Sequence, residues 1–435
     1  MDNESVYIII RNLTRIFAAI MLVKYTVFLL VAPFHRVKES LRKYRIAQRR
    51  QSLAHRRLKS YEPLVSVIVP AWNEEVGILS TLQSIVSNTY SNIQIVVVND
   101  GSTDTTHERV MAFINKFNSR MRNDNKTIVY HAKKNEGKGT ALNHAIERLT
   151  SDIVITIDAD SVADKYMVER IVAYFEDPRV DAVVGNVKVA GDISFINLLQ
   201  RLEYLFGFYH KRAHSVLGAE YIYGGACAAF RKATVFDKLG LFDTSSITED
   251  IEMSMRTRAN GHTAVYADDA ICYTEGASSI MGLIKQRTRW KRGRFEAFGR
   301  YKGLFLSLKT HHNKWMTWFI LPFALLAELQ LLFEPIGITL LVVYSYITGD
   351  YSSLLLGAVF MGLMYLVVGL MTERAKNWWI VPLAPFTWMI FYALVWIEYM
   401  ALLKSISSLV RAEGMTWQRW QRKGISLLTS KGRAS

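Results

Sequence analysis

Apolar positions are spread unevenly along the 435-residue chain and separate a mixed middle region from two apolar ends. Residues 16–33 are apolar for about the length that crosses a bilayer, and long apolar stretches return after Lys314. Between Leu64 and Arg300, short β-branched runs alternate with helical periodicity. We therefore expect a transmembrane anchor at 1–34, a basic linker at 35–63, an α/β domain at 64–275, amphipathic interface helices at 276–313, C-terminal transmembrane helices at 314–405 and a basic tail at 406–435.

The middle region repeats a pattern in which a strand is followed by polar residues and then by a helix. The predicted strands are Val65–Val69, Ile93–Val98, Ile128–His131 and Ile153–Ile157. The polar clusters that follow them lie at 70–75, 99–104, 135–139 and 158–161. Strands and helices at this spacing form a doubly wound, mostly parallel sheet, which binds ligands at the carboxyl ends of its strands. The sequence therefore predicts a site at that edge of the sheet.

Asp158 and Asp160 follow the almost wholly apolar run Ile153–Ile157. Because side chains alternate along an extended chain, the two carboxylates would point the same way. Two anionic oxygen donors suit a hard divalent ion that carries a substrate's phosphates. Asp-x-Asp is a common pattern, however, and a polar cap between strand and turn is the other interpretation.

Charge and cysteine content bear on the compartment. The net charge is +15, with basic residues concentrated at 35–59 and again after Lys404. Nucleic-acid binding is one interpretation of this balance, but basic blocks beside apolar segments are typical of the cytoplasmic side of a membrane. No small-residue cleavage site follows the first apolar stretch, so we expect a retained anchor rather than a signal peptide. Cys227 and Cys272 form no metal-type or disulfide pattern, which indicates a reducing compartment.

The apolar stretches after Lys314 predict the C-terminal spans. Residues 353–371 and 378–404 each suit one span. Residues 315–347 are too long for one upright span, so they form either one tilted helix with an interfacial lead-in or two short helices that turn near 333–335. A cytoplasmic basic tail requires an even number of spans, hence four here and five in the whole chain, while three C-terminal spans remain the alternative.

A series of short motifs carries a resemblance to a known family. They are PAWNEE at 70–75, VVVNDGSTD at 96–104, GKGTALN at 137–143, DAD at 158–160, TED at 248–250 and QRTRW at 286–290. In this order they resemble family-2 glycosyltransferases of the GT-A fold, over about residues 64–300. The last two motifs and the membrane segments resemble the processive synthases that make cellulose, chitin oligomers, hyaluronan and poly-N-acetylglucosamine.

The resemblance implies roles for residues at the strand ends. Glu74 and Asp100 would hold the uridine of a UDP-sugar through hydrogen bonds to their carboxylates, and Lys138 would lie near the nucleotide as a point charge. Asp100 can also be interpreted as a turn and cap residue. Asp160 would coordinate Mg²⁺ or Mn²⁺ that bridges the diphosphate, and Asp158 would support the nucleotide and the metal.

The acidic motif at 248–250 carries the implied base. Inverting sugar transfer needs a carboxylate opposite the leaving group to take the acceptor's proton. The resemblance assigns this role to Asp250, with Glu249 as the next candidate, whereas the other interpretation is a helix N-cap at Thr248. The small residues at 224–231 would line the acceptor region, with Cys227 as a core residue rather than a nucleophile.

Residues 280–298 have the pattern of an amphipathic helix at the membrane interface. Within it, the resemblance implies that Gln286 positions the acceptor and that Arg289 meets the pyrophosphate through its planar, charged fork. Trp290 would stack on the terminal sugar of the acceptor. Arg287 receives no firm role.

The function that the resemblance implies is an inverting, processive glycosyltransferase of the plasma membrane, multi-pass and with a cytoplasmic catalytic domain. An apolar helix at 195–209 would pack this domain onto the membrane. A UDP-sugar, by resemblance UDP-N-acetylglucosamine, would be the donor, and the growing β-linked polysaccharide would be the acceptor and would cross the membrane. Membrane lipids and an accessory subunit or second copy are the other expected partners, whereas nucleic acid is not. The alternatives are a transferase of single sugars to polyprenyl phosphate or ceramide, and a membrane-anchored scaffold for nucleic acid or anionic lipid.

Overall fold

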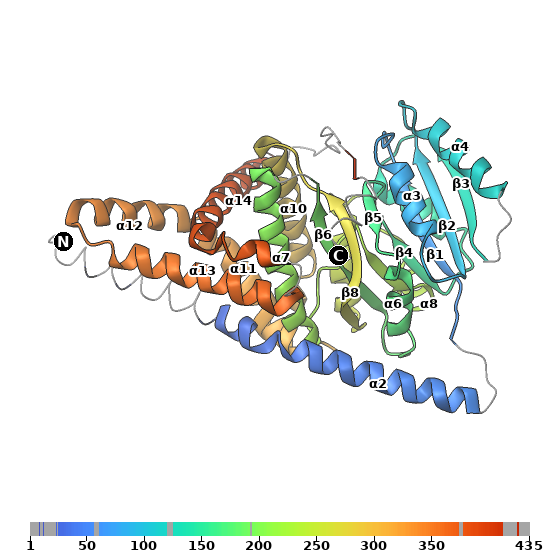
Figure 1. Cartoon of the computed structure of the whole chain (residues 1–435), viewed down its shortest axis with the longest axis horizontal. Coiled ribbons are helices and arrows are strands. Elements are labelled where there is room, and N and C mark those ends of the chain that lie inside the picture. Colours follow the sequence, from blue (N-terminus) through green and yellow to red (C-terminus); the bar gives the residue numbers. More distant parts are fainter. Residues whose placement is uncertain are drawn as a thin grey trace.

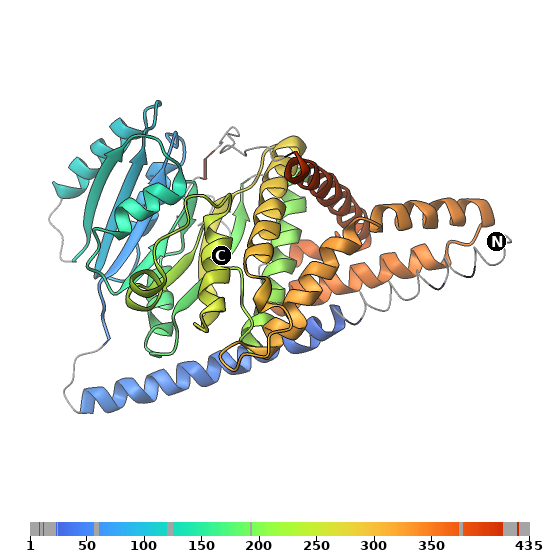
Figure 2. The ribbon, with the colours of Figure 1, turned by 180° about the vertical axis from the view of Figure 1, so that it is seen from behind.

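The computed structural model describes residues 25–55, 61–119, 125–191, 194–373, 377–411 and 424–425, together with positions 8, 12 and 23. Part of the predicted anchor at 16–33 and most of the predicted tail at 406–435 lie outside these residues. An α/β domain lies at one end of the molecule and a group of long helices extends from the other (Figures 1 and 2). Two helices, α7 (Phe195–Val216) and α10 (Ile280–Arg300), stand between these two parts.

The domain is built on an eight-stranded sheet with the order β3-β2-β1-β4-β7-β6-β8-β5 (Figure 1). The strands are β1 (Val65–Ala71), β2 (Ile93–Asp100), β3 (Thr127–Lys133), β4 (Ile153–Thr156), β5 (Ser161–Ala163), β6 (Ala182–Ala190), β7 (Ala228–Arg231) and β8 (Ala264–Glu275). The first four are those that the sequence predicts, and they run parallel. β7 pairs antiparallel with β4 and β6, and β5 pairs antiparallel with β8. The parallel half therefore confirms the predicted α/β sheet, while the other half makes it a mixed sheet of GT-A type.

Helices cover both faces of the sheet, as a doubly wound domain requires. They are α3 (Ile78–Val86), α4 (Thr106–Asn118), α5 (Lys138–Ile146), α6 (Met167–Tyr174), α8 (Lys232–Leu239) and α9 (Glu249–Ala259). Val65, Val67 and Val69 of β1 belong to a core with α3, α4 and α6, whereas Ile68 belongs to a core with α5, α8 and α9. Because both faces are covered, the predicted strands are mostly apolar, with single polar residues such as Ser66 and Gln94, and do not alternate strictly.

The remaining elements follow α10 along the chain. They are η1 (Lys302–Leu304), η2 (Met316–Ile320), α11 (Leu321–Leu331), α12 (Glu334–Thr348), α13 (Ser352–Glu373), η3 (Trp378–Ile380), η4 (Ala384–Phe386) and α14 (Thr387–Val410). Leu202 of α7 and Leu283 of α10 share an apolar cluster with Tyr365 of α13 and Leu394 of α14. α7 extends the helix predicted at 195–209 and packs, as expected, between the domain and the long helices.

Within the described residues, two helical segments are long and apolar enough to cross a membrane, Ser352–Thr372 and Ala384–Val410. The pair Met316–Leu331 and Glu334–Thr348 meets the same criterion only when taken together, and it is bent by 51° at its break. The break lies beside Pro335, which lacks a backbone N–H for a continuous helix. The structure thus has two helices with a break near 333–335, and its described residues hold two candidate spans, or three if this bent pair is one span. The four C-terminal spans expected from the sequence stay a prediction.

The basic segment expected as a linker contains a long helix, α2 (Phe34–His55), which lies along the domain (Figure 1). Arg50 pairs with Glu176 at 2.6 Å beyond the end of α6. Arg36 donates to the carbonyl oxygen of Thr372 at 3.1 Å, at the end of α13. Basic residues of α2 thus tie the domain to the long helices.

Candidate active site

A cavity of about 1140 Å³ lies at the carboxyl ends of β1, β2 and β4, between this edge of the sheet and helices α7 and α10. All the site residues expected from the sequence line it, namely Glu74, Asp100, Lys138, Asp158, Asp160, Asp250, Gln286, Arg289 and Trp290. Parallel strands end at the same edge of a sheet, so the fold gathers motifs that are far apart in the sequence. The cavity is therefore the candidate active site.

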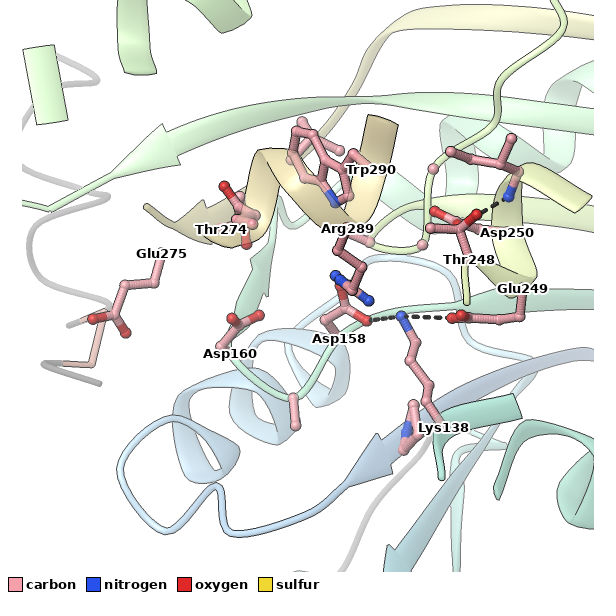
Figure 3. A pocket seen from close by; sticks show the side chains of 18 of the residues that line it. Lys138, Asp158, Asp160, Thr248, Glu249, Asp250, Thr274, Glu275, Arg289 and Trp290 are labelled. Atoms are coloured by element: carbon pink, nitrogen blue, oxygen red, sulfur yellow. Dashed lines mark hydrogen bonds and ion pairs between the residues drawn. The ribbon is translucent and has the colours of Figure 1, made fainter. Parts of the chain in front are cut away.

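Asp158 and Asp160 lie in a tight turn that follows β4. The strand ends at Thr156, and the amide of Ser161 donates to the carbonyl oxygen of Asp158 at 3.0 Å. The two carboxylates are therefore presented by a turn, and not by the strand alternation that we expected (Figure 3). The Ser161 hydroxyl donates to Asp160 Oδ1 at 3.1 Å and so orients that carboxylate.

The donors in this turn suit a hard divalent ion that is shared with a ligand. Within the described part of the chain, no group of three or more His, Cys, Asp or Glu side chains is arranged to hold a metal ion. Asp158 and Asp160 nevertheless supply carboxylate oxygens, and Mg²⁺ is commonly held by one or two carboxylates together with substrate phosphates. The residues present thus fit an ion whose coordination is completed by a diphosphate.

Lys138 connects carboxylates from two different motifs (Figure 3). Its Nζ lies 2.6 Å from Asp158 Oδ1 and 3.2 Å from Glu249 Oε1. Burial opposes the charged form of Lys138, but Asp158 and the other nearby carboxylates outweigh burial and raise its pKa. Gly225 makes room for this cation, because a Cβ there would come within 2.7 Å of Nζ. The lysine expected near a nucleotide is thus held in place by acidic side chains.

Asp250 lies in the first turn of α9. Thr248 occupies the N-cap position, but its side chain makes no capping hydrogen bond; Asp250 Oδ1 instead accepts from the amide of Ile251 at 2.9 Å. Burial, aided by the charge of Glu249, raises the pKa of Asp250 to about 6, although Lys138 and another nearby cation oppose the shift. A carboxyl group with such a pKa is a stronger base than an exposed aspartate and is still deprotonated at neutral pH.

A glycine brings α10 against the start of α9. The helix begins at Ile280, where the Ser279 side chain accepts from a backbone amide as N-cap. A Cβ at Gly293 would overlap the Thr248 side chain, so glycine permits the close contact. This contact lets Trp290 and Asp250 line the same cavity from two helices.

Two of the residues that we expected to hold a nucleotide have clear contacts in the fold. Asp100 is buried and accepts from Lys133 Nζ at 2.8 Å and from the amide of Gly137 at 2.7 Å. It therefore also fixes a loop, in line with its interpretation as a turn residue. The amide of Glu74 donates to the Thr106 hydroxyl at 2.9 Å, which anchors the segment after β1 to α4.

The cavity also has a wall that the sequence analysis did not assign. α7 contributes Glu203 and Tyr204, and the segment before β7 contributes Glu220 and Tyr221. The Leu and Phe spacing of α7 led us to expect only packing from it. Polar residues within an apolar helix were the available signal, since such residues need a partner or a ligand. Cys227, by contrast, is buried as expected.

The fold and the cavity together define a transferase domain of GT-A type. A mannosyltransferase from Pyrobaculum calidifontis, solved with GDP-mannose and Mn²⁺, has a similar fold, with a TM-score of 0.56 over 90% of this chain and 99% of that one at 20% identity. The family described as glycosyl transferase family 2 matches residues 66–238, and glycosyl transferase family group 2 matches residues 153–403. The second match covers more than half of the chain, which therefore belongs to glycosyl transferase family group 2.

Two curated relatives are similar in sequence. The poly-β-1,6-N-acetyl-D-glucosamine synthase of Staphylococcus aureus (strain COL) is 31% identical over 252 residues, which cover 57% of this chain and 58% of the relative. The enzyme of the same name from Staphylococcus epidermidis is 31% identical over 271 residues, 61% of each chain. The similarity thus spans less than two thirds of the length of these relatives.

Proposed function

We propose that this chain is an inverting, metal-dependent glycosyltransferase that extends a β-linked polysaccharide from a UDP-sugar. The observation that carries the proposal is the cavity, which collects a raised-pKa carboxylate, a carboxylate turn and an aromatic side chain between a GT-A sheet and apolar helices. The names of the curated relatives favour N-acetylglucosamine as the sugar, hence UDP-N-acetylglucosamine as the donor. The product would leave through the chain's own membrane helices.

The residues divide the reaction between donor and acceptor. Asp250 would take the proton from the acceptor hydroxyl as that oxygen attacks the anomeric carbon and UDP departs. Arg289 would bind the pyrophosphate, and Trp290 would hold the acceptor's terminal sugar with the help of Gln286. Glu74 would contact the uridine.

A divalent ion fits the same scheme. Asp160 would hold Mg²⁺ or Mn²⁺, with Asp158 in support, and the ion would offset the charge that develops on the leaving UDP. The Mn²⁺ in the Pyrobaculum calidifontis mannosyltransferase is in keeping with this. Lys138 would keep the Asp158 carboxylate in place through their ion pair.

Product analysis tests the proposal directly. The purified chain in lipid nanodiscs should release UDP from UDP-N-acetylglucosamine and form a polymer, whereas Asp250→Asn should do neither at a comparable rate. A panel of other UDP-sugars is the control for the sugar. Products that carry one added sugar on a lipid would point instead to a single-sugar transferase, and no release of UDP from any donor would disprove the enzyme proposal.

The same chain would lie in the plasma membrane with its catalytic domain in the cytoplasm. Cysteines placed at Arg45, which is exposed, and at Val410, which is 82% exposed, should both be shielded from an impermeant thiol reagent in intact cells and should react after lysis. Both native cysteines are buried and give little background. Labelling at 410 alone would mean three C-terminal spans and would contradict the five-span arrangement.

A further inference from the structure

A chain of ion pairs joins the acceptor side of the cavity to the long helices. It alternates carboxylate and cation in the order Glu203, Arg287, Glu398, Lys291, Glu328 and Arg294. The cations lie at positions i, i+4 and i+7 of α10, on one face of the helix. The carboxylates come from α7, α14 and α11. The N–O distances along this ion-pair chain are 2.5, 3.2, 2.7, 2.8 and 2.6 Å.

Arg287 is the member of the ion-pair chain that lies over the Trp290 ring. Its guanidinium carbon lies 4.1 Å from the centroid of the Trp290 ring, and the residue is 2% exposed. Glu203 and Glu398 hold the guanidinium from two other helices. A buried guanidinium over an indole face is an attractive contact that favours one ring orientation. The orientation of Trp290 therefore depends on side chains of α7 and α14.

If the contact of α10 with the neighbouring helices served only stability, it would not need these charges. Leu283 of α10 already packs with Ile390 and Leu394 of α14 in an apolar cluster, and buried ion pairs often stabilise a protein less than apolar residues of similar volume. Glu398 lies in a segment long and apolar enough to cross a membrane. Ionisable residues are costly in such segments and usually have a function.

We propose that Arg287 is a positioning residue for Trp290 and that Glu398 of α14 sets the position of Arg287. The inference rests on the proposed function, in which Trp290 holds the acceptor. Glu398 pairs with both Arg287 and Lys291, so a shift of α14 along α10 changes the ion pair between Glu398 and Arg287. The position of α14 then affects the affinity for the acceptor. By linkage, acceptor binding also affects the position of α14.

A spectroscopic experiment tests the positioning without any substrate. The full-length chain is prepared in nanodiscs with 5-fluorotryptophan at its ten tryptophans, and the ¹⁹F resonance of Trp290 is assigned by its absence from Trp290→Phe. We expect this resonance to shift in Arg287→Lys and in Glu398→Gln. Glu296→Gln is the matched control. Glu296 pairs with Arg292 at 3.1 Å, more than a turn beyond Arg287 along α10, so this variant should leave the Trp290 resonance unchanged.

The two variants are chosen so that each outcome either supports or overturns the positioning role of Arg287. Glu398→Gln keeps the volume and removes the charge, while Arg287→Lys keeps the charge and loses the planar fork. An unchanged Trp290 resonance in both overturns the proposal. If neither variant folds, the ion-pair chain is a requirement of stability, and the proposal is again overturned.

A kinetic double-mutant cycle tests whether the effect passes through Trp290. Glu398→Gln should raise the KM for an oligosaccharide acceptor on the order of 3- to 10-fold, with donor KM and acceptor-independent UDP release within about twofold of wild type. The same change should add nothing in the Trp290→Ala background, and an equal effect in both backgrounds contradicts the inference. A wild type that forms no polymer would instead count against the proposed function, and the ¹⁹F result would stand apart from it.

Discussion

Two charged clusters border the same cavity, and they differ in their balance of charge. The acidic cluster at the sheet edge consists of Asp158, Asp160, Glu249 and Asp250 with Lys138 among them. The ion-pair chain on α10 alternates carboxylates and cations from one end to the other. Carboxylates are in excess in the first, whereas the second is neutral as a whole.

This difference indicates what each cluster is for. An excess of carboxylates in a partly buried site is unfavourable until a cation or a proton offsets it. The acidic cluster is therefore suited to a divalent ion and to a proton from the acceptor. The charges of the ion-pair chain balance one another without a ligand, so they can hold helices and the Trp290 ring in place. Four experiments test this difference between the two clusters, in order of decreasing expected effect.

The largest effect is expected at the metal. Asp160→Ala removes the proposed ligand and should abolish sugar transfer, and chelation of the wild type should do so reversibly. Mg²⁺ or Mn²⁺ together with UDP should raise the Tm of the wild type but not that of Asp160→Ala, since binding to the folded state stabilises it. Full turnover in excess EDTA would show that the reaction does not require a divalent ion.

The next effect concerns the base. Asp250→Asn keeps the shape of the side chain but cannot accept a proton, so transfer should fall on the order of 10²–10⁴-fold. Donor affinity, measured by UDP-sugar titration, should be nearly unchanged. A near wild-type rate in this variant would mean that the base lies elsewhere in the acidic cluster.

The parallel half of the fold could be predicted because its signals are local. β1 and β2 are rich in β-branched residues, as in Ile93–Val98, and are followed by turn-forming polar residues. The antiparallel half escaped prediction, since β7 (Ala228–Arg231) and β5 (Ser161–Ala163) are short and depend on pairing with distant strands. Register between remote segments is set by tertiary packing, which single segments do not encode.

The site was predictable to the extent that its motifs are short and lie at strand ends. Sequence reasoning placed Asp158 and Asp160 at the cavity but expected a strand where the chain makes a turn. It did not assign Glu203 or Glu398, because a carboxylate within an apolar helix indicates that a partner is needed but not which cation on another helix supplies it. Nor could it show that the missing side chain of Gly293 makes room for the Thr248 side chain, because this close approach is visible only in three dimensions.

Gly293 offers a smaller perturbation of the acidic cluster. Gly293→Ala puts a Cβ into the Thr248 side chain, so α9 and α10 must move apart. Overpacking of this kind costs about 1–3 kcal/mol, and a misplaced base should lower the transfer rate by roughly 10- to 100-fold. Gly299→Ala is the matched control, because nothing lies within 4 Å of its Cβ on the same helix. It should keep full activity and gain up to about 1 kcal/mol of stability, and equal activity of the two variants would contradict the role of this contact.

The smallest effect is a pair of opposite shifts in the pH profile. Asp250 can act as a base only when it is deprotonated, so kcat/KM should fall below about pH 6, the raised pKa of this carboxyl group. Glu249 contributes to that rise, and Glu249→Gln should therefore lower the pKa of Asp250 and move the acid limb to lower pH. Lys138 opposes the rise, so Lys138→Met should move the limb to higher pH, each by about one unit or less.

The directions of these shifts matter more than their size. Glu249 and Lys138 pair with each other at 3.2 Å, so a general loosening of the site would affect both variants alike, whereas an electrostatic effect on Asp250 must have opposite signs. Shifts in the same direction would mean that the acid limb reports another group. Loss of all activity in Glu249→Gln, with activity retained in Asp250→Asn, would identify Glu249 as the base in place of Asp250. Figure 3 shows Glu249 and Asp158 on opposite sides of the Lys138 ammonium, so a base at Glu249 would be a carboxylate that pairs directly with Lys138.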